Sequence, residues 1–146
     1  MQTFEYFLES NLARVGAPDK ERAKSLINDG KGRIESIETL DINKYPKIIF
    51  ENIYDALRDF CDALLINDDF RSYSHEASIS YLFKKGFDVT VVNRLDRFRY
   101  KRNSSKYYGE QVSIDEAKQI KDFYLEIKEL CVFIQLFSNN DINFLS

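Results

Sequence analysis

Apolar residues recur at three- and four-residue intervals along most of the chain, which is the spacing of one face of an α-helix. Six segments carry this period, and glycine, proline or paired acidic residues separate them. We expect helices over residues 3–15, 19–37, 46–65, 74–86 and 90–104 and from residue 113 onward. Thr3 and Asp19 stand at the first two starts, where a side-chain oxygen can accept a hydrogen bond from a first-turn N–H group.

Two of these segments carry the strongest signals. In the last one, Ser113 and Glu116 have the spacing of a capping box, and an apolar seam follows from Ile114 to Ile134. The third segment begins near Pro46, a residue favoured in the first turn of a helix, and its apolar face is unusually wide. We therefore expect the third helix at the centre of a bundle.

Turn-forming residues are scarce, and this sets the fold class. The 146 residues include five glycines and two prolines, whereas sheet-rich folds need many more turns. The sequence predicts an all-α, up-and-down bundle of four main helices with short flanking helices, as a single domain over residues 1–146. Gly30 falls inside the second segment, so that helix either bends there or meets a closely packed neighbour.

The composition argues against several classes of protein and of site. Hydrophobic residues make up 44% of the chain and charged residues 31%, which is typical of a globular protein. Cys61 and Cys131 lie far apart and His75 is the single histidine, so we expect no metal site and no cofactor. No apolar run approaches the roughly 18 residues that span a bilayer, and no signal-peptide pattern is visible. We expect a cytoplasmic protein without membrane attachment.

Charge is unevenly distributed along the chain. The formal net charge is −3, yet between residues 94 and 106 six cations face a single acid, Asp96. The six are Arg94, Arg97, Arg99, Lys101, Arg102 and Lys106. A basic segment on an acidic chain is a candidate phosphate site, although most such runs are solvated helix faces.

Arg102 is the most unusual residue of this segment. Helical spacing puts it on one face with Leu95 and Phe98, so a cation continues an apolar stripe. A buried guanidinium needs a carboxylate, a phosphate or an interface partner, because it does not lose its proton. In one interpretation Arg102 pairs with an acid such as Asp55 or Asp59 near the end of its helix. In the other interpretation it binds phosphate.

A family resemblance bears on this choice. Residues 102–109 (RNSSKYYG), followed by residues 112–117 (VSIDEA), resemble the end of a HEPN domain, named for higher eukaryotes and prokaryotes nucleotide-binding. Upstream, residues 54–65 are similar to the central helix of that family, and residues 72–77 (SYSHEA) to the segment after it. The matches lie in the family's order over residues 54–130. The resemblance implies a helical bundle that frequently forms two-fold dimers.

The resemblance also implies candidate site residues. Many HEPN proteins are metal-independent endoribonucleases that use an arginine, its polar neighbour and a histidine four to six residues on. Arg102 and Asn103 match the first two, and Tyr107 stands where the histidine is expected, so these three are the candidate catalytic residues. A tyrosine, with a pKa near 10, is a poor general base at neutral pH. This departure favours binding over cleavage.

Further residues take supporting roles in this interpretation. The candidate RNA- or phosphate-binding residues are Arg97, Arg99, Lys101, Lys106 and Tyr108. Asp55 and Asp59 are candidates for orienting Arg102 across the bundle. His75 lies near a helix start, and a lone histidine there is more often a capping or surface residue than a catalyst.

We therefore expect a HEPN-like RNA- or nucleotide-binding protein. The family implies a homodimer that works beside a nucleotidyltransferase in a toxin–antitoxin or defence setting. The first alternative is a metal-independent endoribonuclease toxin that uses Arg102 to stabilise phosphate charge. The second is a non-catalytic interaction bundle in which Arg102 forms a structural ion pair.

Overall fold

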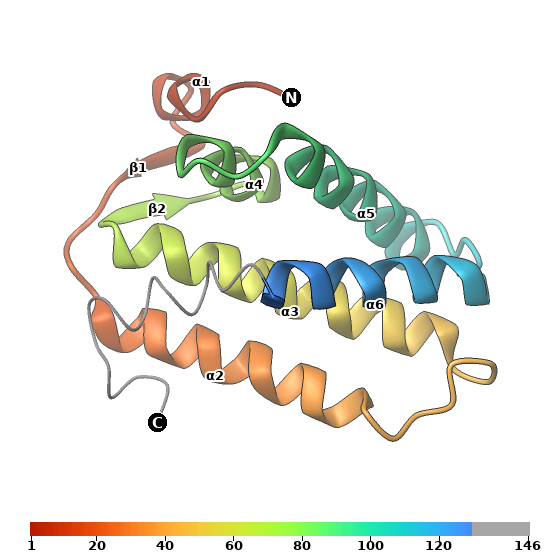
Figure 1. The fold of residues 1–146 in the computed structure, drawn as a ribbon. Coiled ribbons are helices and arrows are strands. Elements are labelled where there is room, and N and C mark those ends of the chain that lie inside the picture. Colours follow the sequence, from red (N-terminus) through yellow and green to blue (C-terminus); the bar gives the residue numbers. More distant parts are fainter. Residues whose placement is uncertain (130–146) are drawn as a thin grey trace.

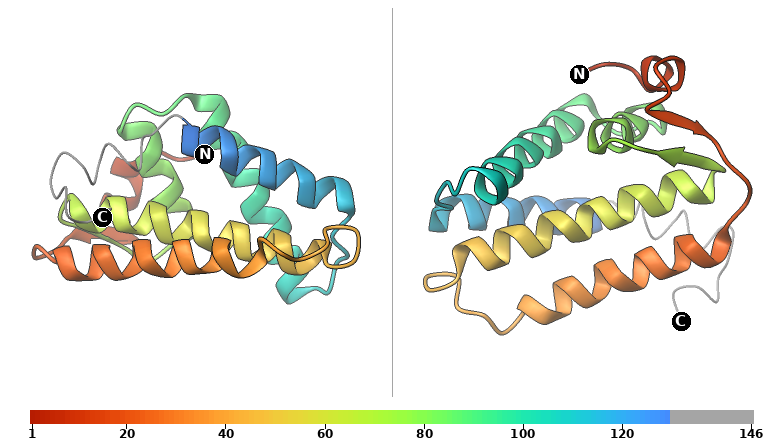
Figure 2. Two further views of the ribbon diagram at one scale, coloured as in Figure 1. Left: turned by 60° about the horizontal axis from the view of Figure 1, so that its bottom comes forward. Right: turned by 180° about the vertical axis from the view of Figure 1, so that it is seen from behind.

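The structure, a computed structural model, describes residues 1–129. In chain order its elements are α1 (Phe4–Glu9), β1 (Ala13–Val15), α2 (Lys20–Ile37), α3 (Pro46–Asn67), β2 (Phe70–Ser72), α4 (His75–Lys84), α5 (Val89–Tyr107) and α6 (Ile114–Glu129). Helices α2 and α3 lie side by side and antiparallel, and α6 lies across α3 (Figures 1 and 2). The predicted all-α bundle of four long helices with short flanking helices is confirmed.

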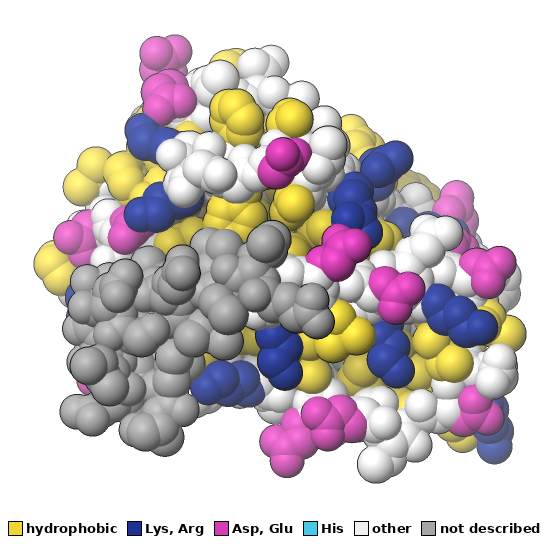
Figure 3. Space-filling model, viewed as in Figure 1, with side chains coloured by type: hydrophobic (Ala, Val, Ile, Leu, Met, Phe, Trp, Pro, Cys, Tyr) yellow, Lys and Arg dark blue, Asp and Glu magenta, His cyan; other side chains and the backbone are white. Residues whose placement is uncertain are grey.

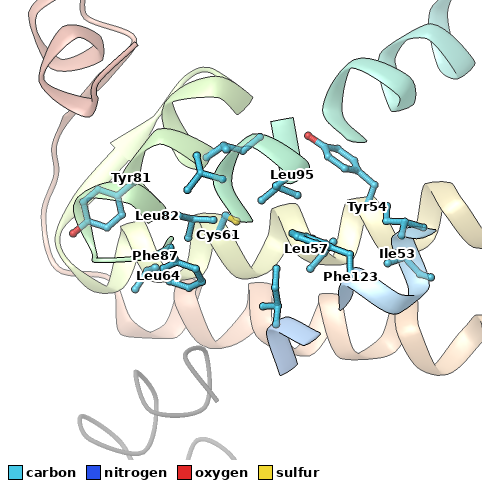
Figure 4. Close-up of a cluster of buried hydrophobic side chains, with 14 of the residues drawn as sticks. Ile53, Tyr54, Leu57, Cys61, Leu64, Tyr81, Leu82, Phe87, Leu95 and Phe123 are labelled. Carbon is cyan, nitrogen blue, oxygen red and sulfur yellow. The ribbon is translucent and has the colours of Figure 1, made fainter. Parts of the chain in front are cut away.

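Helix α3 is the centre of the bundle, as its wide apolar face predicts. It packs against α2, α4, α5 and α6. Figure 4 shows Leu57 of α3 directed toward Phe123 of α6, with Leu82 of α4 and Leu95 of α5 in the same cluster. All four side chains are almost completely buried. The element that carries the acidic residues Glu51, Asp55 and Asp59 is therefore held in place on all sides by apolar packing.

The predicted helix starts agree with the observed caps. The Thr3 hydroxyl accepts a hydrogen bond from the N–H of Tyr6 at 3.2 Å. The Asp19 carboxylate accepts one from the N–H of Arg22 at 3.0 Å. At the start of α6, Ser113 and Glu116 make the reciprocal bonds of a capping box, at 3.0 and 3.1 Å. Each cap satisfies an N–H group that has no partner within its helix.

The prediction of one helix over residues 3–15 is wrong. Helix α1 ends at Glu9, and Asn11 adopts a left-handed conformation with φ of 61°, which a continuing helix does not allow. Residues Ala13–Val15 instead form β1, which pairs antiparallel with β2, Ala13 opposite Ser72. Ala13 is buried whereas Arg14 and Val15 are exposed, so the strand follows from its pairing with β2 and not from an alternating apolar pattern.

Helix α5 runs further than the sequence indicates. The prediction ended it at Ser104, whereas the structure continues it to Tyr107, with Tyr108 as its C-cap. Asn103 and Tyr107 therefore lie one turn apart on the same helix face. The last predicted seam holds from Ile114 to Ile127, and its continuation through Cys131 and Ile134 lies outside the described residues.

Gly30 shows which of the two expectations for α2 holds. The helix is continuous from Lys20 to Ile37, and a Cβ atom at Gly30 would lie 2.5 Å from the ring of Phe60 on α3. The glycine therefore permits the two helices to approach closely. Of the described residues, no helix is long and apolar enough to cross a membrane.

Candidate functional site

Arg102 is buried and held by carboxylates of α3. Only 9% of its surface is exposed. Its Nε and Nη2 atoms donate hydrogen bonds to the two oxygens of Asp55, at 3.3 and 3.1 Å, and its Nη1 lies 3.6 Å from an oxygen of Glu51. Burial alone would lower the pKa of Arg102, but these two acids outweigh it and raise the pKa. Of the two interpretations of Arg102, the geometry therefore agrees with pairing to a carboxylate, and Asp55 orients the guanidinium.

This pair belongs to a longer chain of charges. Arg33 of α2 donates a hydrogen bond to Asp59 at 3.0 Å and lies 3.9 Å from Asp55. Asp59 therefore pairs with Arg33 and makes no ion pair with Arg102 among the described residues. The alternating charges tie α2 and α5 to the central helix α3. A network of this kind fixes helix positions more effectively than an isolated surface pair.

One nitrogen of Arg102 is left without a hydrogen bond. Its Nη1 is the only buried side-chain nitrogen or oxygen in residues 1–129 that has no hydrogen-bond partner. The nearby Glu51 accepts a hydrogen bond on Oε1 from the hydroxyl of Ser105 at 2.7 Å, while its Oε2 lies 3.6 Å from Nη1, beyond hydrogen-bond distance. The guanidinium is consequently fixed mainly by Asp55.

A different face of α5 lines an open depression. The depression has a volume of about 280 Å³ and lies between the start of α4 and the second half of α5. Its lining residues are Ser74, His75, Glu76, Arg99, Asn103 and Tyr107. We refer to it as the α4–α5 depression. Two of the three predicted catalytic residues, Asn103 and Tyr107, therefore lie together here, and the only histidine of the sequence joins them.

Arg99 joins the two sides of the α4–α5 depression. It is 7% exposed, donates a hydrogen bond to Asp96 at 2.8 Å and lies 3.5 Å from Glu76 of α4. Its guanidinium also lies 4.4 Å from the ring centre of Tyr100. Burial opposes the charge of Arg99, yet Asp96 and Glu76 raise its pKa above the ordinary value. Arg99 therefore stays charged beside the depression, and Asp96 and Glu76 balance its charge.

His75 is uncharged at neutral pH in this setting. Partial burial, together with the positive charges of Arg58 and Arg99, lowers the pKa of His75 to about 4. One ring nitrogen of a neutral imidazole accepts a hydrogen bond and the other donates one. With the amide of Asn103 and the hydroxyl of Tyr107, the depression offers three neutral groups that can both donate and accept.

Aromatic side chains flank the depression and are open to solvent. The exposed fractions of Tyr100, Tyr107 and Tyr108 are 62%, 67% and 80%. Tyr100 and Tyr107 are seven residues apart on α5, which places them on one face, roughly 10 Å apart along the axis. The exposed Lys106 has its Nζ atom 5.5 Å from the ring centre of Tyr107. Flat rings beside a cation are the groups on which nucleic acid bases stack.

The six cations of the basic segment do not form one surface. Arg94, Arg97 and Lys101 line a separate groove of about 510 Å³ between α5 and α6. Arg94 pairs with Glu126 at 2.6 Å, and Lys101 with Glu116 at 3.3 Å. On the face shown in Figure 3, basic and acidic side chains are interspersed. The expected set of phosphate ligands is therefore divided between two sides of α5.

Sequence reasoning took His75 for a capping or surface residue and left it out of the site. The hydroxyl of Ser74, not His75, accepts the capping hydrogen bond at the start of α4, at 3.1 Å. His75 reaches Asn103 and Tyr107 only because α4 packs against α5. No sequence spacing links His75 to Asn103 and Tyr107. The only indication in the sequence that they belong together was the order of the segments that resemble a HEPN domain.

Comparison of the chain with protein-family models, curated proteins and solved structures finds no match. Within residues 1–129, no three His, Cys, Asp or Glu side chains gather in a way that could hold a metal ion. The functional interpretation consequently depends on the residues and geometry of this chain.

Proposed function

We propose that the protein binds single-stranded RNA at the α4–α5 depression. The observation that carries the proposal is the convergence of His75, Asn103 and Tyr107, from two helices, on one open cavity that the ion-paired Arg99 also lines. Neutral groups that donate and accept hydrogen bonds suit base edges and 2′-hydroxyls, and exposed tyrosines suit base faces. In this arrangement Arg102 positions α5, and the residues beside it make the contacts.

The shape of the site favours an RNA strand over a free nucleotide. Nucleotide pockets enclose most of their ligand, whereas the α4–α5 depression is open to solvent. Tyr100 and Tyr107 lie roughly 10 Å apart, which is more than the distance between neighbouring stacked bases. A strand that contacts both rings must therefore be several nucleotides long.

RNA affinity can be measured by fluorescence anisotropy with a labelled oligouridine of about twelve nucleotides at low salt. Removal of one stacking ring typically weakens binding by 1–3 kcal/mol, so Tyr107→Ala should lower the affinity roughly five- to 150-fold. Tyr6→Ala removes an exposed ring from α1, far from the depression, and serves as the matched control. Equal affinities for the two variants, or no binding by the wild type, would contradict the proposal.

The HEPN resemblance extends the proposal to partners. It implies that two copies associate and that a nucleotidyltransferase is the second component of a toxin–antitoxin or defence pair. Support within this chain comes from Tyr108, which is 80% exposed and does not line the depression, because aromatic residues are enriched in protein interfaces. Light scattering should give twice the mass of one chain, about 34 kDa against 17.2 kDa. A mass of one chain at micromolar concentration would remove this part of the proposal.

A second candidate function is RNA cleavage, and the placement of His75 favours it. In such a reaction the 2′-hydroxyl attacks the adjacent phosphorus, its proton passes to the His75 imidazole, and the 5′-oxygen leaves with a proton from water. The protonated His75 then returns its proton to the solvent. The products are a 2′,3′-cyclic phosphate and a 5′-hydroxyl, and no co-reactant is consumed. His75 carries no proton at neutral pH and can accept one, although its low pKa makes it a weak base.

Incubation of oligoribonucleotides with the protein in EDTA tests this candidate. Wild type should cleave and His75→Gln should not, because the amide keeps a similar shape but accepts no proton. Cleavage at equal rates by both proteins would identify a contaminating nuclease. RNA binding without cleavage would leave binding as the function.

A further inference from the structure

A second cavity lies on the opposite side of the bundle from α4, between α2, α3 and α6. Its volume is about 240 Å³. Aliphatic side chains form its inner walls: Ile37, Ile49 and Ile53 are nearly fully buried, while Ile34 and Ile42 are half-buried at its edge. Exposed residues of α6 border the space, so it is a pocket that opens to solvent on one side. The buried isoleucines of its inner wall offer apolar contacts to an aliphatic guest.

The loop between α2 and α3 fixes one wall of the cavity. Within it, the N–H groups of Lys44 and Tyr45 donate hydrogen bonds to the carbonyl of Asp41, at 3.0 and 2.8 Å. The Asp41 carboxylate accepts another from the N–H of Asn43 at 2.9 Å. These bonds close a tight turn around Ile42, which lines the cavity. The wall is therefore already in place before any ligand arrives.

Two lysines of α6 stand at the mouth. Lys121 and Lys128 are seven residues apart, on the same helix face, with Tyr124 and Leu125 between them. Both lysines are exposed, and no carboxylate among residues 1–129 forms an ion pair with either. Among residues 1–129, Glu38 is the single acid that lines the cavity, on the other edge. Figure 3 shows hydrophobic side chains reaching the surface between dark blue ones along α6.

We propose that this cavity binds an aliphatic monocarboxylate of about eight carbons, with the chain inside and the carboxylate between Lys121 and Lys128. The size follows from a comparison: a 150 Å³ apolar cavity holds benzene, which gives about 25 Å³ for each heavy atom and roughly ten heavy atoms here. The two lysines against one glutamate leave a positive mouth that complements a carboxylate. This site is separate from the α4–α5 depression and independent of RNA binding.

Methyl NMR spectra of isoleucine-labelled protein test the proposal, with sodium octanoate as the probe. Octanoate should shift the methyl signals of the cavity isoleucines saturably, with a Kd on the order of 0.1–1 mM. Butanoate is too short to fill the cavity and should bind at least tenfold more weakly. The absence of saturable shifts with octanoate, or shifts confined to isoleucines elsewhere, would overturn the proposal.

Three variants separate charge from shape. Lys121→Gln combined with Lys128→Gln should weaken octanoate about three- to tenfold but leave octan-1-ol unchanged, because only the acid uses the lysines. Lys31→Gln, on an exposed part of α2, is the matched control. Ile42→Trp should fill the cavity and abolish both interactions, with circular dichroism confirming that the variant is folded. The site would be refuted if Lys31→Gln weakened octanoate binding as much as the double lysine variant, or if the Ile42→Trp protein bound octanoate as well as wild type.

Discussion

Arg102 and Asn103 are consecutive residues of α5, yet their side chains lie in different environments. Arg102 faces α3, where it is 9% exposed and holds Asp55 with two hydrogen bonds. Asn103 faces α4 and lines an open depression with His75 and Tyr107. One face of the helix has its charges already paired, and the next face offers groups that are free to meet a ligand.

The two environments separate a stabilising role from a binding role, whereas the sequence motif had suggested one shared role for these residues. A motif read along the chain suggests that Arg102, Asn103 and Tyr107 act together. In the folded protein the arginine is surrounded by acids, so a phosphate there would have to displace a carboxylate already in place. The stabilising role and the binding role therefore fall to different faces of α5, and each can be changed without the other.

The largest expected effect is on stability. Arg102→Met removes the cation nearest to Asp55 and Glu51 and should lower the free energy of unfolding by about 2–4 kcal/mol, because a largely buried carboxylate that loses its main partner keeps its desolvation cost. Only the more distant Arg33 and Lys47, each at 3.9 Å, remain beside the two acids.

Arg97→Met is the matched control on the same helix. Arg97 is exposed and has no ion pair within residues 1–129, so its loss should cost less than about 0.5 kcal/mol. Urea denaturation measures the free energy of unfolding of both variants. Equal decreases for Arg102→Met and Arg97→Met would contradict the stabilising role of Arg102.

The titration of His75 tests the environment of the α4–α5 depression. Because the sequence has one histidine, its ring signals can be followed by NMR as the pH falls, and the midpoint should lie at about 4 rather than near 6.5. The lowered pKa means that the folded state binds fewer protons than the unfolded state below pH 6.5. The contribution of His75 to the free energy of unfolding should therefore be constant above pH 6.5 and should decrease as the pH falls toward 4. His75→Gln should remove that part of the decline, and a midpoint near 6.5 would show that the ring is not buried as described.

A smaller effect is expected at Asn103. Loss of a neutral hydrogen bond to RNA costs about 0.5–1.5 kcal/mol, so Asn103→Ala should weaken binding roughly two- to tenfold. Asn93→Ala makes the same change at an exposed position of α5 that does not line the depression. Anisotropy titrations should show a loss for the first variant alone. A loss of the same size for both would place the RNA elsewhere on α5.

The smallest effect concerns salt. Lys106 is exposed beside the depression and is the candidate for a direct phosphate contact. Lys106→Gln should reduce the slope of log affinity against log salt concentration by about 0.7, the value for one phosphate contact to a single strand. Lys118→Gln, on an exposed position of α6, should leave the slope unchanged. An unchanged slope in both would mean that Lys106 makes no phosphate contact.

Much of the fold could be predicted because its determinants are local. Helical spacing, the caps at Thr3, Asp19 and Ser113 and the stop after residue 37 depend on residues within one or two turns. The end of α1 could not be predicted in this way. Residues Ala13–Val15 become a strand through pairing with β2, more than 50 residues away in the chain.

The candidate site was predicted in part for the same reason. Helical phase identified Arg102 as anomalous and named Asp55 among its partners, since both lie on regular helices of known period. The place of His75 beside Asn103 depends on how α4 packs on α5. Spacing along a single chain does not contain this information.

The central claim is that Arg102 stabilises the bundle while its neighbours bind RNA. The most direct test measures RNA affinity of Arg102→Met and Tyr107→Ala, at a temperature where urea titration shows both to be folded. We predict that Arg102→Met binds within about twofold of wild type despite its lower stability, whereas Tyr107→Ala loses at least fivefold with stability unchanged. The reverse pattern, with RNA binding lost in Arg102→Met and retained in Tyr107→Ala, would contradict the claim.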